Sequence, residues 1–153
     1  MEGERFTAYL CNQGYWTIGV GRNLETVGLS DTESMAIFGE VIERHETIER
    51  LRHLVITPEQ SEMLFMNDLA RSEEQCYRNI KMNGNNARRA VIINMCFQLG
   101  IGGLLKFKNT LAFYESENYI DTSVEMMDSK WARKDTPGRA EILCAQMKTG
   151  EWQ

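Results

Sequence analysis

The pattern of hydrophobic and polar positions divides the chain into a short strand-forming part and a longer helical part. Residues 15–20, with the sequence YWTIGV, are aromatic and β-branched, and glycines stand at positions 14, 19 and 21. Such residues favour strands, and the glycines indicate tight turns or a close approach of backbones. We therefore predict a small sheet near the beginning of the chain. Residues 30–52 follow it, with Glu, Ile and Leu at loose helical spacing.

A long helix is predicted to begin at Thr57-Pro58. Thr57 can cap the helix, Pro58 suits its first position, and Gln60 can complete a capping box. The apolar residues that follow fit one face of a helix of about five turns. The sequence NGN at residues 83–85 is a turn signal, which places the end of the helix before it.

A second helix is predicted over residues 87–99, ARRAVIINMCFQL. After Arg89 this segment is apolar nearly all round, which is typical of a helix in the centre of a core. Glycines at 100, 102 and 103 are expected to end it. Shorter helices are predicted over residues 109–116, 119–133 and 136–148.

This order of elements predicts an α+β fold, with a small N-terminal lobe that holds a short antiparallel sheet, a long connecting helix and an all-helical C-terminal lobe. We expect the first lobe to span residues 1–56, the connecting helix residues 57–80 and the second lobe residues 81–153. The whole chain of 153 residues has the usual size of one domain.

The composition is that of a globular protein, with 42% hydrophobic and 25% charged residues. A formal net charge of -5 argues against nonspecific nucleic-acid binding, which needs an excess of Lys and Arg. The first ten residues contain two glutamates and no long apolar run, so no secretory signal is predicted. The segment from Ala90 to Leu105 is too polar to span a membrane. We expect a soluble protein made in a cytoplasm, without membrane insertion.

The four cysteines, at positions 11, 76, 96 and 144, match no zinc-binding pattern. Cys76 and Cys96 lie in apolar helical patterns and are expected to be buried. Because disulfides need an oxidising compartment, we predict free thiols.

Reactive side chains concentrate in the first lobe, where Glu2, Cys11 and Thr17 are separated by eight and five residues. A carboxyl group is the usual general acid for cleaving an acetal bond, because it protonates the leaving oxygen. A second group must then hold or activate water, or attack directly. A chain with 22 acidic residues offers many such triplets, so the spacing alone is weak evidence.

The residues around this triplet make it more specific. Glu2-Gly3, Arg5 and Ala8-Tyr9, read together with the run GYWTIGVG at residues 14–21, resemble the active-site opening of phage lysozymes. These are the muramidases typified by the lysozyme of T-even bacteriophages. The likeness continues in order along nearly the whole chain. It includes TPEQSEMLFMND at 57–68, RAVIINMCFQLG at 89–100, FKNTL at 107–111, SKW at 129–131, TPGRA at 136–140 and TGEW at 149–152.

The resemblance implies hydrolysis of the β-1,4 bond between N-acetylmuramic acid and N-acetylglucosamine in bacterial peptidoglycan. It implies a monomer that needs no metal or cofactor and acts on the wall after release from the host cytoplasm. Glu2 matches the general acid, Thr17 matches a threonine that helps to place water, and Arg139 matches an arginine that pairs with the glutamate. The positions that match substrate contacts are Asn23, Phe97, Gln98 and Thr110.

Two residues depart from the family pattern. Cys11 stands where the family usually has an aspartate that activates or positions water, so the thiol can serve as a base, as a water-positioning group or as a nucleophile, or it can be an inert residue. Arg22 replaces a histidine that pairs with an aspartate on the connecting helix, here Asp68. We expect an Arg22–Asp68 ion pair that does not titrate near neutrality.

Two alternatives to a lysozyme stay open from the sequence. One is a catalytically silent module on the same scaffold that binds peptidoglycan, because a fold does not fix a function. The other is a lytic transglycosylase, which needs the acid but no water activator. Among the tryptophans, Trp131 and Trp152 are expected to lie in the core rather than to serve as sugar platforms. Phe97 fits the core and an exposed cleft equally well.

Overall fold

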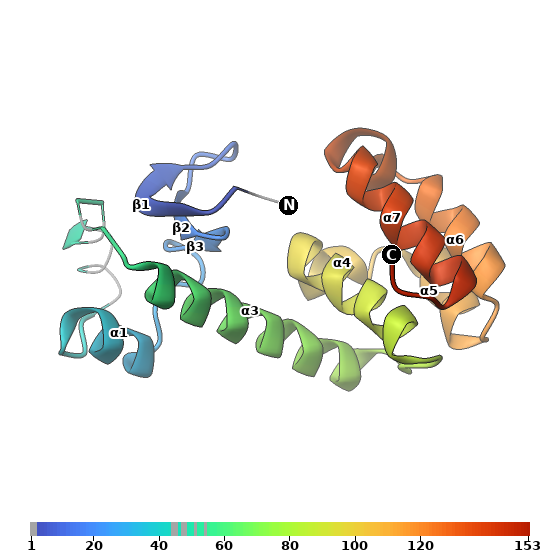
Figure 1. Ribbon diagram of the computed structural model, residues 1–153, viewed down its shortest axis with the longest axis horizontal. Helices are drawn as coiled ribbons and strands as arrows, with labels where there is room; N and C mark the ends of the chain where they lie inside the picture. The colour runs from blue at the N-terminus through green and yellow to red at the C-terminus, as the bar shows by residue number, and fades with distance from the viewer. Residues whose placement is uncertain (1–2, 44–45, 47–48, 51, 54) are drawn as a thin grey trace. The chain divides into compact units, whose positions relative to one another are not determined.

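A three-stranded antiparallel sheet forms near the beginning of the chain, as the sequence predicts (Figure 1). Strands β1 (Arg5–Leu10), β2 (Trp16–Gly19) and β3 (Arg22–Asn23) follow one another in this order across the sheet. The predicted strand at residues 15–20 is β2. Gly19 and Gly21 have φ angles of 65° and 87°, which favour glycine and permit the tight turn into β3.

The computed structural model describes residues 3–43, 46, 49–50, 52–53 and 55–153. The chain divides into two compact units, Met1–Asp68 and Leu69–Gln153. A sheet in the first unit and helices in the second confirm the α+β fold class. The predicted division into lobes 1–56 and 81–153 with a connecting helix over 57–80 stays a prediction.

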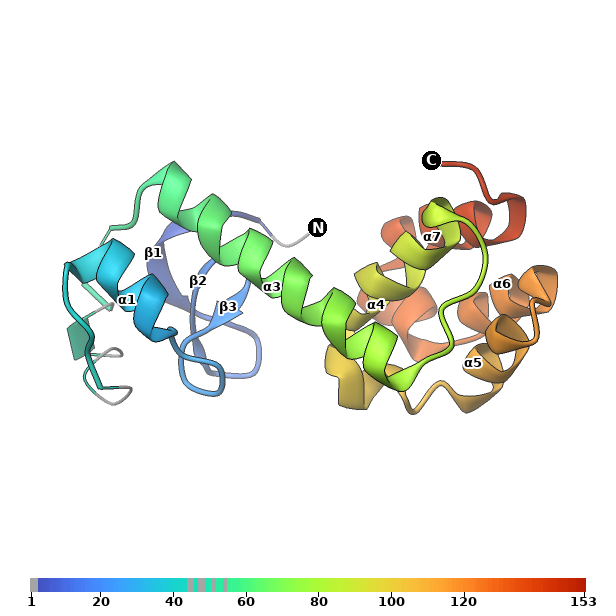
Figure 2. The same cartoon turned by 90° about the horizontal axis from the view of Figure 1, so that it is seen from below.

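Helices α1 and α3 border the sheet in the first unit (Figure 2). Helix α1 (Asp31–Phe38) begins with a capping box between Ser30 and Glu33. Helix α3 (Pro58–Asn79) begins with the capping box predicted from the sequence: the Gln60 N–H donates to Thr57 Oγ1 at 3.1 Å, and the Thr57 N–H donates to Gln60 Oε1 at 2.9 Å. The core between these elements and the sheet contains Ile18, Leu24, Ile56 and Leu64.

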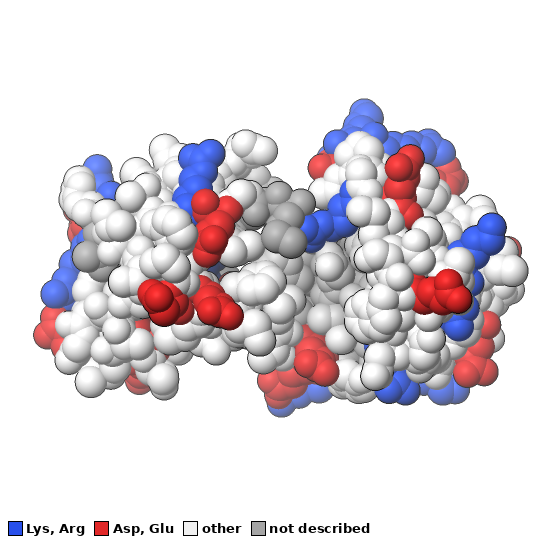
Figure 3. Space-filling view, viewed as in Figure 1, with Lys and Arg blue, Asp and Glu red and all other residues white. Residues whose placement is uncertain are grey.

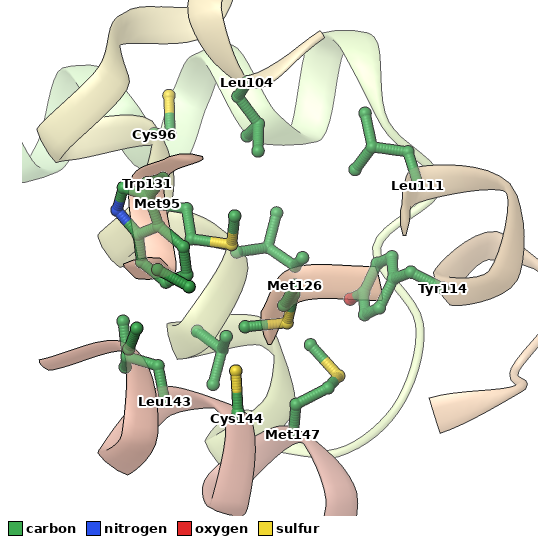
Figure 4. Close-up of a cluster of buried hydrophobic side chains, with 14 of the residues drawn as sticks. Met95, Cys96, Leu104, Leu111, Tyr114, Met126, Trp131, Leu143, Cys144 and Met147 are labelled. Atoms are coloured by element: carbon green, nitrogen blue, oxygen red, sulfur yellow. The ribbon is translucent and has the colours of Figure 1, made fainter. Parts of the chain in front are cut away.

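Helix α4 (Asn86–Leu104) lies at the centre of the second unit, as its apolar sequence predicts. Figure 4 shows its residues Met95 and Cys96 in the core, together with Met126, Cys144 and other side chains of the later helices. Glycines 100, 102 and 103 were expected to end the helix, and Gly100 does interrupt it. Gly100 adopts φ 73° and ψ 160°, and the chain resumes a helical course up to Leu104 after this kink. The remaining elements are α5 (Lys108–Glu115), α6 (Tyr119–Met127), η1 (Trp131–Asp135) and α7 (Pro137–Thr149).

The single helix predicted over residues 119–133 is wrong. It ends at Met127 and is followed by η1, a short π-helix. Ser129 accounts for the break, because its hydroxyl donates to the Met126 carbonyl at 2.7 Å and accepts from the Ala132 N–H at 3.2 Å. A serine that bonds the backbone in this way competes with continued helix.

Two tryptophans expected in the core differ in burial. Trp131 is 2% exposed and packs in the core of the second unit, whereas Trp152 is 66% exposed, so the expectation for Trp152 is wrong. Trp152 follows Gly150, whose left-handed conformation (φ 73°) ends α7, so it lies outside that helix.

Arg88 on α4 holds the end of α7. Its Nε donates to the Met147 carbonyl at 2.9 Å, its Nη2 donates to the Lys148 carbonyl at 3.1 Å, and its guanidinium lies 4.1 Å from the Tyr119 ring centroid. These carbonyls are among the last of the helix, which lack partners within it. A cation there also complements the helix dipole.

All four cysteines carry free thiols, as predicted, and Cys76 and Cys96 are buried. Within the described ranges no group of three His, Cys, Asp or Glu side chains is placed to hold a metal ion. No single described helix is long and apolar enough to cross a membrane, although α4 and α5, bent by 106° at their junction, pass that test together on length and composition.

Candidate active site

Cys11 lies in the turn that joins β1 to β2. The turn is closed by bonds from the Cys11 N–H to the Tyr15 carbonyl and from the Gly14 N–H to the Cys11 carbonyl, each 2.9 Å long. Backbone hydrogen bonds at Tyr15 and Gln13, with a smaller contribution from the Thr17 hydroxyl, lower the pKa of the Cys11 thiol below its usual value. The partly exposed sulfur therefore carries more thiolate near neutrality than an ordinary cysteine.

Thr17 lies on β2 opposite Tyr9 and is only 3% exposed. Its hydroxyl oxygen is 3.0 Å from the Tyr15 carbonyl and also within hydrogen-bond reach of the Cys11 sulfur. One hydroxyl has one proton to donate, so it can serve the carbonyl when Cys11 is a thiol and the sulfur when Cys11 is a thiolate. The structure thus brings together two of the three side chains predicted to be catalytic.

The third predicted catalytic residue, Glu2, lies outside the described residues. Asn23, predicted to contact substrate, uses its side-chain oxygen locally, where it accepts the backbone N–H groups of Glu25 and Thr26 at 2.9 Å each. This turn leaves the Asn23 amide nitrogen for other contacts, and the role of Asn23 toward substrate stays a prediction.

Arg22 forms the predicted ion pair with Asp68 and a second one that the sequence did not reveal. Its Nε donates to both Asp68 oxygens at 3.0 and 3.1 Å, and its two terminal nitrogens donate to the Glu33 carboxylate at 2.8 Å each. Arg22 and Glu33 are both 2% exposed. Burial opposes ionisation of each group and is the largest single effect, but the partners of each group together outweigh it. Glu33 and Asp68 raise the pKa of Arg22, and Arg22, Asn67 and Ser30 lower the pKa of Glu33 to about 2.

The same network extends to neutral groups around it. Arg22 also donates to the carbonyls of Gly28 and Leu64 at 3.1 and 3.2 Å, and the Asn67 amide donates to Glu33 at 2.9 Å. The Arg22 guanidinium therefore connects four parts of the first unit: its own strand β3, the loop before α1, α1 and α3. Because β3 is hydrogen-bonded to β2, the network supports the strand that carries Thr17.

In the second unit, Gln98 and Arg139 are linked through a residue that the sequence did not single out, Asn94. The Asn94 side-chain oxygen accepts from Gln98 Nε2 at 2.9 Å and from Arg139 Nη1 at 3.2 Å. On its other side the Gln98 oxygen accepts from Trp131 Nε1 at 2.8 Å. The available signal was two amides four residues apart in an otherwise apolar helix, which places them on one face.

The two other predicted sugar contacts differ in exposure. Phe97 is half-buried. Thr110 is 3% exposed and offers a ligand little surface. Both assignments stay predictions.

Charge is distributed unevenly between the units. The first unit contains five Arg and Lys against twelve Asp and Glu, a net charge of -7, whereas the second contains twelve against ten, a net charge of +2. On the face shown in Figure 3, basic side chains gather over η1 and its neighbours, where the sequence has Lys130, Arg133 and Lys134. Arg133 pairs there with Asp128. The chain therefore contains a basic segment although its net charge is negative.

The chain is similar in sequence to several known proteins. A family model described as phage lysozyme matches residues 1–141. "Probable T4-type lysozyme 1" of Dictyostelium discoideum is 30% identical, covering 97% of this chain and 89% of that protein. The "Pre-baseplate central spike protein Gp5" of Enterobacteria phage T4 is 29% identical over 97% of this chain but only 26% of its own length. "Peptidoglycan hydrolase gp36" of Pseudomonas phage phiKMV is 33% identical over 60% of this chain and 10% of that protein. The chain belongs to the phage lysozyme family.

Proposed function

We propose that this protein is a muramidase that hydrolyses the β-1,4 bond between N-acetylmuramic acid and N-acetylglucosamine in bacterial peptidoglycan, and that it serves to lyse the host cell. The observation that carries the proposal is the pairing of Cys11 with Thr17. A partly exposed thiol of lowered pKa and a hydroxyl within its reach occupy the two positions at which the family resemblance requires groups that act on water. Relatives named lysozyme and peptidoglycan hydrolase support the reaction class.

The proposed hydrolysis needs one proton donor and one group that acts on water. The Glu2 carboxyl gives its proton to the glycosidic oxygen as the bond from that oxygen to the anomeric carbon breaks. A water oxygen forms the new bond to the anomeric carbon, and its proton passes to the Cys11 thiolate. Proton return from the thiol to Glu2 through solvent restores both groups.

The lowered pKa of Cys11 favours the role of base over that of an inert residue. A thiol of ordinary pKa, about 8.5, is mostly protonated near neutrality and cannot accept a proton. Backbone hydrogen bonds that stabilise the thiolate shift this balance, and Thr17 can orient the attacking water with the lone pairs of its hydroxyl. A thiolate can also attack carbon directly, so the stereochemistry of the product is part of the test.

Digestion of purified peptidoglycan tests the proposal through its products. A muramidase releases fragments that end in N-acetylmuramic acid with a free reducing end, whereas a transglycosylase releases anhydro-sugar ends. We expect Glu2→Gln to abolish release. Cys11→Ser should slow it by about 100-fold or more, the usual contribution of a general base, and Cys11→Asp should retain most of the rate. A parental rate in Cys11→Ser would remove the thiol from the mechanism. Proton NMR of the first-formed anomer distinguishes inversion, expected for a base, from retention, expected for a nucleophile.

A second candidate function is a peptidoglycan-binding module within a phage structural assembly. The similarity to the central spike protein favours it, because this chain matches about a quarter of that protein. Sedimentation with insoluble peptidoglycan, without release of fragments, would support this role and contradict the muramidase proposal.

A further inference from the structure

A chain of hydrogen bonds links α4, η1 and α7 within the second unit. It begins at the indole nitrogen of Trp131, which donates to Gln98 Oε1 at 2.8 Å, with Thr136 Oγ1 at 3.5 Å from the same oxygen. It continues from Gln98 Nε2 to Asn94 Oδ1 at 2.9 Å, and the same oxygen accepts from Arg139 Nη1 at 3.2 Å. A single oxygen of Asn94 therefore holds both Gln98 and Arg139.

The direction of this chain is fixed by the groups at its two ends. An indole N–H and a guanidinium can only donate. Because Trp131 donates, Gln98 must turn its oxygen toward the indole and its nitrogen toward Asn94. Because Arg139 and Gln98 both donate to Asn94, that amide must present its oxygen to them. Neither amide can rotate by half a turn without placing donors against donors.

This fixed direction determines which hydrogen-bonding groups remain for a ligand. The Gln98 and Asn94 oxygens each accept two bonds, so their acceptor capacity is used within the network. Among the described residues, the groups left over are the second N–H of Gln98 Nε2, the remaining guanidinium N–H groups of Arg139 and the Nδ2 group of Asn94. Every remaining group is a donor.

We propose that Asn94 is a positioning residue that holds Gln98 and Arg139 as a donor-only surface, and that this surface selects carbonyl or carboxylate oxygens of the glycan. Acetamido carbonyls and carboxylates both fit it, whereas a free amino group does not, because an ammonium has three donors and no acceptor. The role in turnover rests on the proposed muramidase function. The orientation of the two amides rests on the hydrogen bonds alone.

Kinetics on soluble peptidoglycan fragments test the positioning role. In Asn94→Ala the Gln98 and Arg139 side chains lose their common acceptor, and we expect KM to rise about 10-fold with a smaller change in kcat, since substrate binding is affected more than chemistry. Asn94→Asp keeps the acceptor but removes the amide donor and adds a negative charge beside Arg139. It should restore the orientation of Gln98 without restoring KM. In Trp131→Phe the Gln98 oxygen loses its indole donor while Asn94 still holds the Gln98 nitrogen, so KM should rise less than in Asn94→Ala.

Asn85→Ala is the matched control, because it makes the same substitution on the same helix. Asn85 caps α4 by accepting from the Arg88 N–H at 3.1 Å and takes no part in the network. It should lower stability without changing KM. An equal rise of KM in Asn85→Ala and Asn94→Ala would show a structural effect only and would overturn the positioning role.

Side-chain amide NMR tests the donor surface independently of activity. The probes are tri-N-acetylchitotriose, the fully deacetylated trimer and sodium acetate, added to the ¹⁵N-labelled protein. The signals are assigned by their loss in Gln98→Glu and Asn94→Asp. We expect the acetylated trimer or acetate to shift the NH₂ signals of Gln98 and Asn94. A response to the trimer identifies the acetamido carbonyl as the group recognised, and a response to acetate identifies a carboxylate.

Equal shifts with the deacetylated trimer, or none with either acceptor, would overturn the donor-only assignment. If the parent protein releases no fragments from peptidoglycan, the muramidase proposal fails. The NMR result then still decides whether the surface binds acceptor oxygens. The two failures are therefore distinguishable.

Discussion

Replacement of Arg22 by methionine removes the cation from a buried network while preserving much of the side-chain volume. In the parent this guanidinium donates to Asp68, to Glu33 and to two backbone carbonyls, and it is 2% exposed. Methionine makes none of these bonds. Glu33, also 2% exposed, is left as a carboxylate without its cation.

The expected loss of unfolding free energy at pH 7 is about 4 kcal/mol. Breaking a buried ion pair from one side costs about 3–5 kcal/mol, because the remaining charge stays desolvated. The carbonyls of Gly28 and Leu64 also lose a donor, and each buried group without a partner costs about 1–3 kcal/mol. Two effects limit the sum: Asn67 still donates to Glu33 at 2.9 Å, and Glu33 can take up a proton.

The sign of the pH dependence should differ between the two proteins. In the parent the pKa of Glu33 is lowered from 4.5 to about 2, so its contribution to stability is present above pH 4.5 and is lost as the pH falls toward 2. In Arg22→Met burial acts without the opposing arginine, and the pKa of Glu33 rises above 4.5. The folded variant then prefers the protonated carboxyl and is stabilised relative to the parent as the pH falls.

Urea unfolding followed by circular dichroism at pH 7 and pH 3 measures both effects. We expect the gap between parent and variant to narrow from about 4 to about 2 kcal/mol, since one pKa unit corresponds to 1.36 kcal/mol. Arg50→Met is the matched control, because Arg50 pairs with Glu40 at the surface, where the two side chains are 44% and 58% exposed. Such a pair contributes less than about 1 kcal/mol. A loss below 1 kcal/mol for Arg22→Met at pH 7, or an equal loss at both pH values, would refute the reasoning.

Three further predictions concern the replacement of Arg22 by histidine, the reactivity of the four thiols and the effect of salt on lytic activity. In Arg22→His the two carboxylates should raise the histidine pKa, so the stability from this pair is present below the unfolded value of about 6.5 and is lost as the pH rises through the folded pKa. A profile identical to the parent's between about pH 5 and 8 would contradict it. A chromogenic disulfide reagent should react rapidly with one thiol of the native protein, Cys11, and with four after unfolding, because the others are at most 4% exposed. Rapid reaction of the native Cys11→Ser variant would disprove this. Lytic activity should increase up to moderate salt, about 0.1 M, because salt screens the repulsion between an anionic wall and a chain of net charge -5. Activity that rises steeply as salt is removed would count against this.

Local signals in the sequence predicted β2, the start of α3 and the central position of α4. The capping box of Thr57 and Gln60 involves residues three apart, and the buried character of α4 is written in its own composition. The break after α6 was missed because it depends on whether the Ser129 hydroxyl bonds to water or to the backbone. The pattern of apolar and polar residues does not determine which of these hydrogen bonds forms.

The two networks were harder to predict because their members are distant in sequence. Glu33 reads as the third residue of a capping box, and only the folded chain shows that the same carboxylate also receives Arg22. Asn94 reads as an interruption of an apolar helix until Arg139, 45 residues later, is placed beside it. The family resemblance supplied Arg139 and Gln98 but not the residue that connects them.

The hydrogen bonds from Arg88 to the end of α7 have a consequence for the order in which the protein folds during synthesis. Its carbonyl partners at Met147 and Lys148 lie 59 and 60 residues further along the chain, and Asn85 bonds the Gly150 carbonyl 65 residues later. The second unit therefore cannot close until its final helix has left the ribosome. The first unit has all its Arg22 partners once Asp68 has emerged. We expect it to fold on the ribosome while the second unit is still being made, in keeping with N-terminal units folding first. A nascent chain arrested before residue 147 should then be protected from protease in its first unit only.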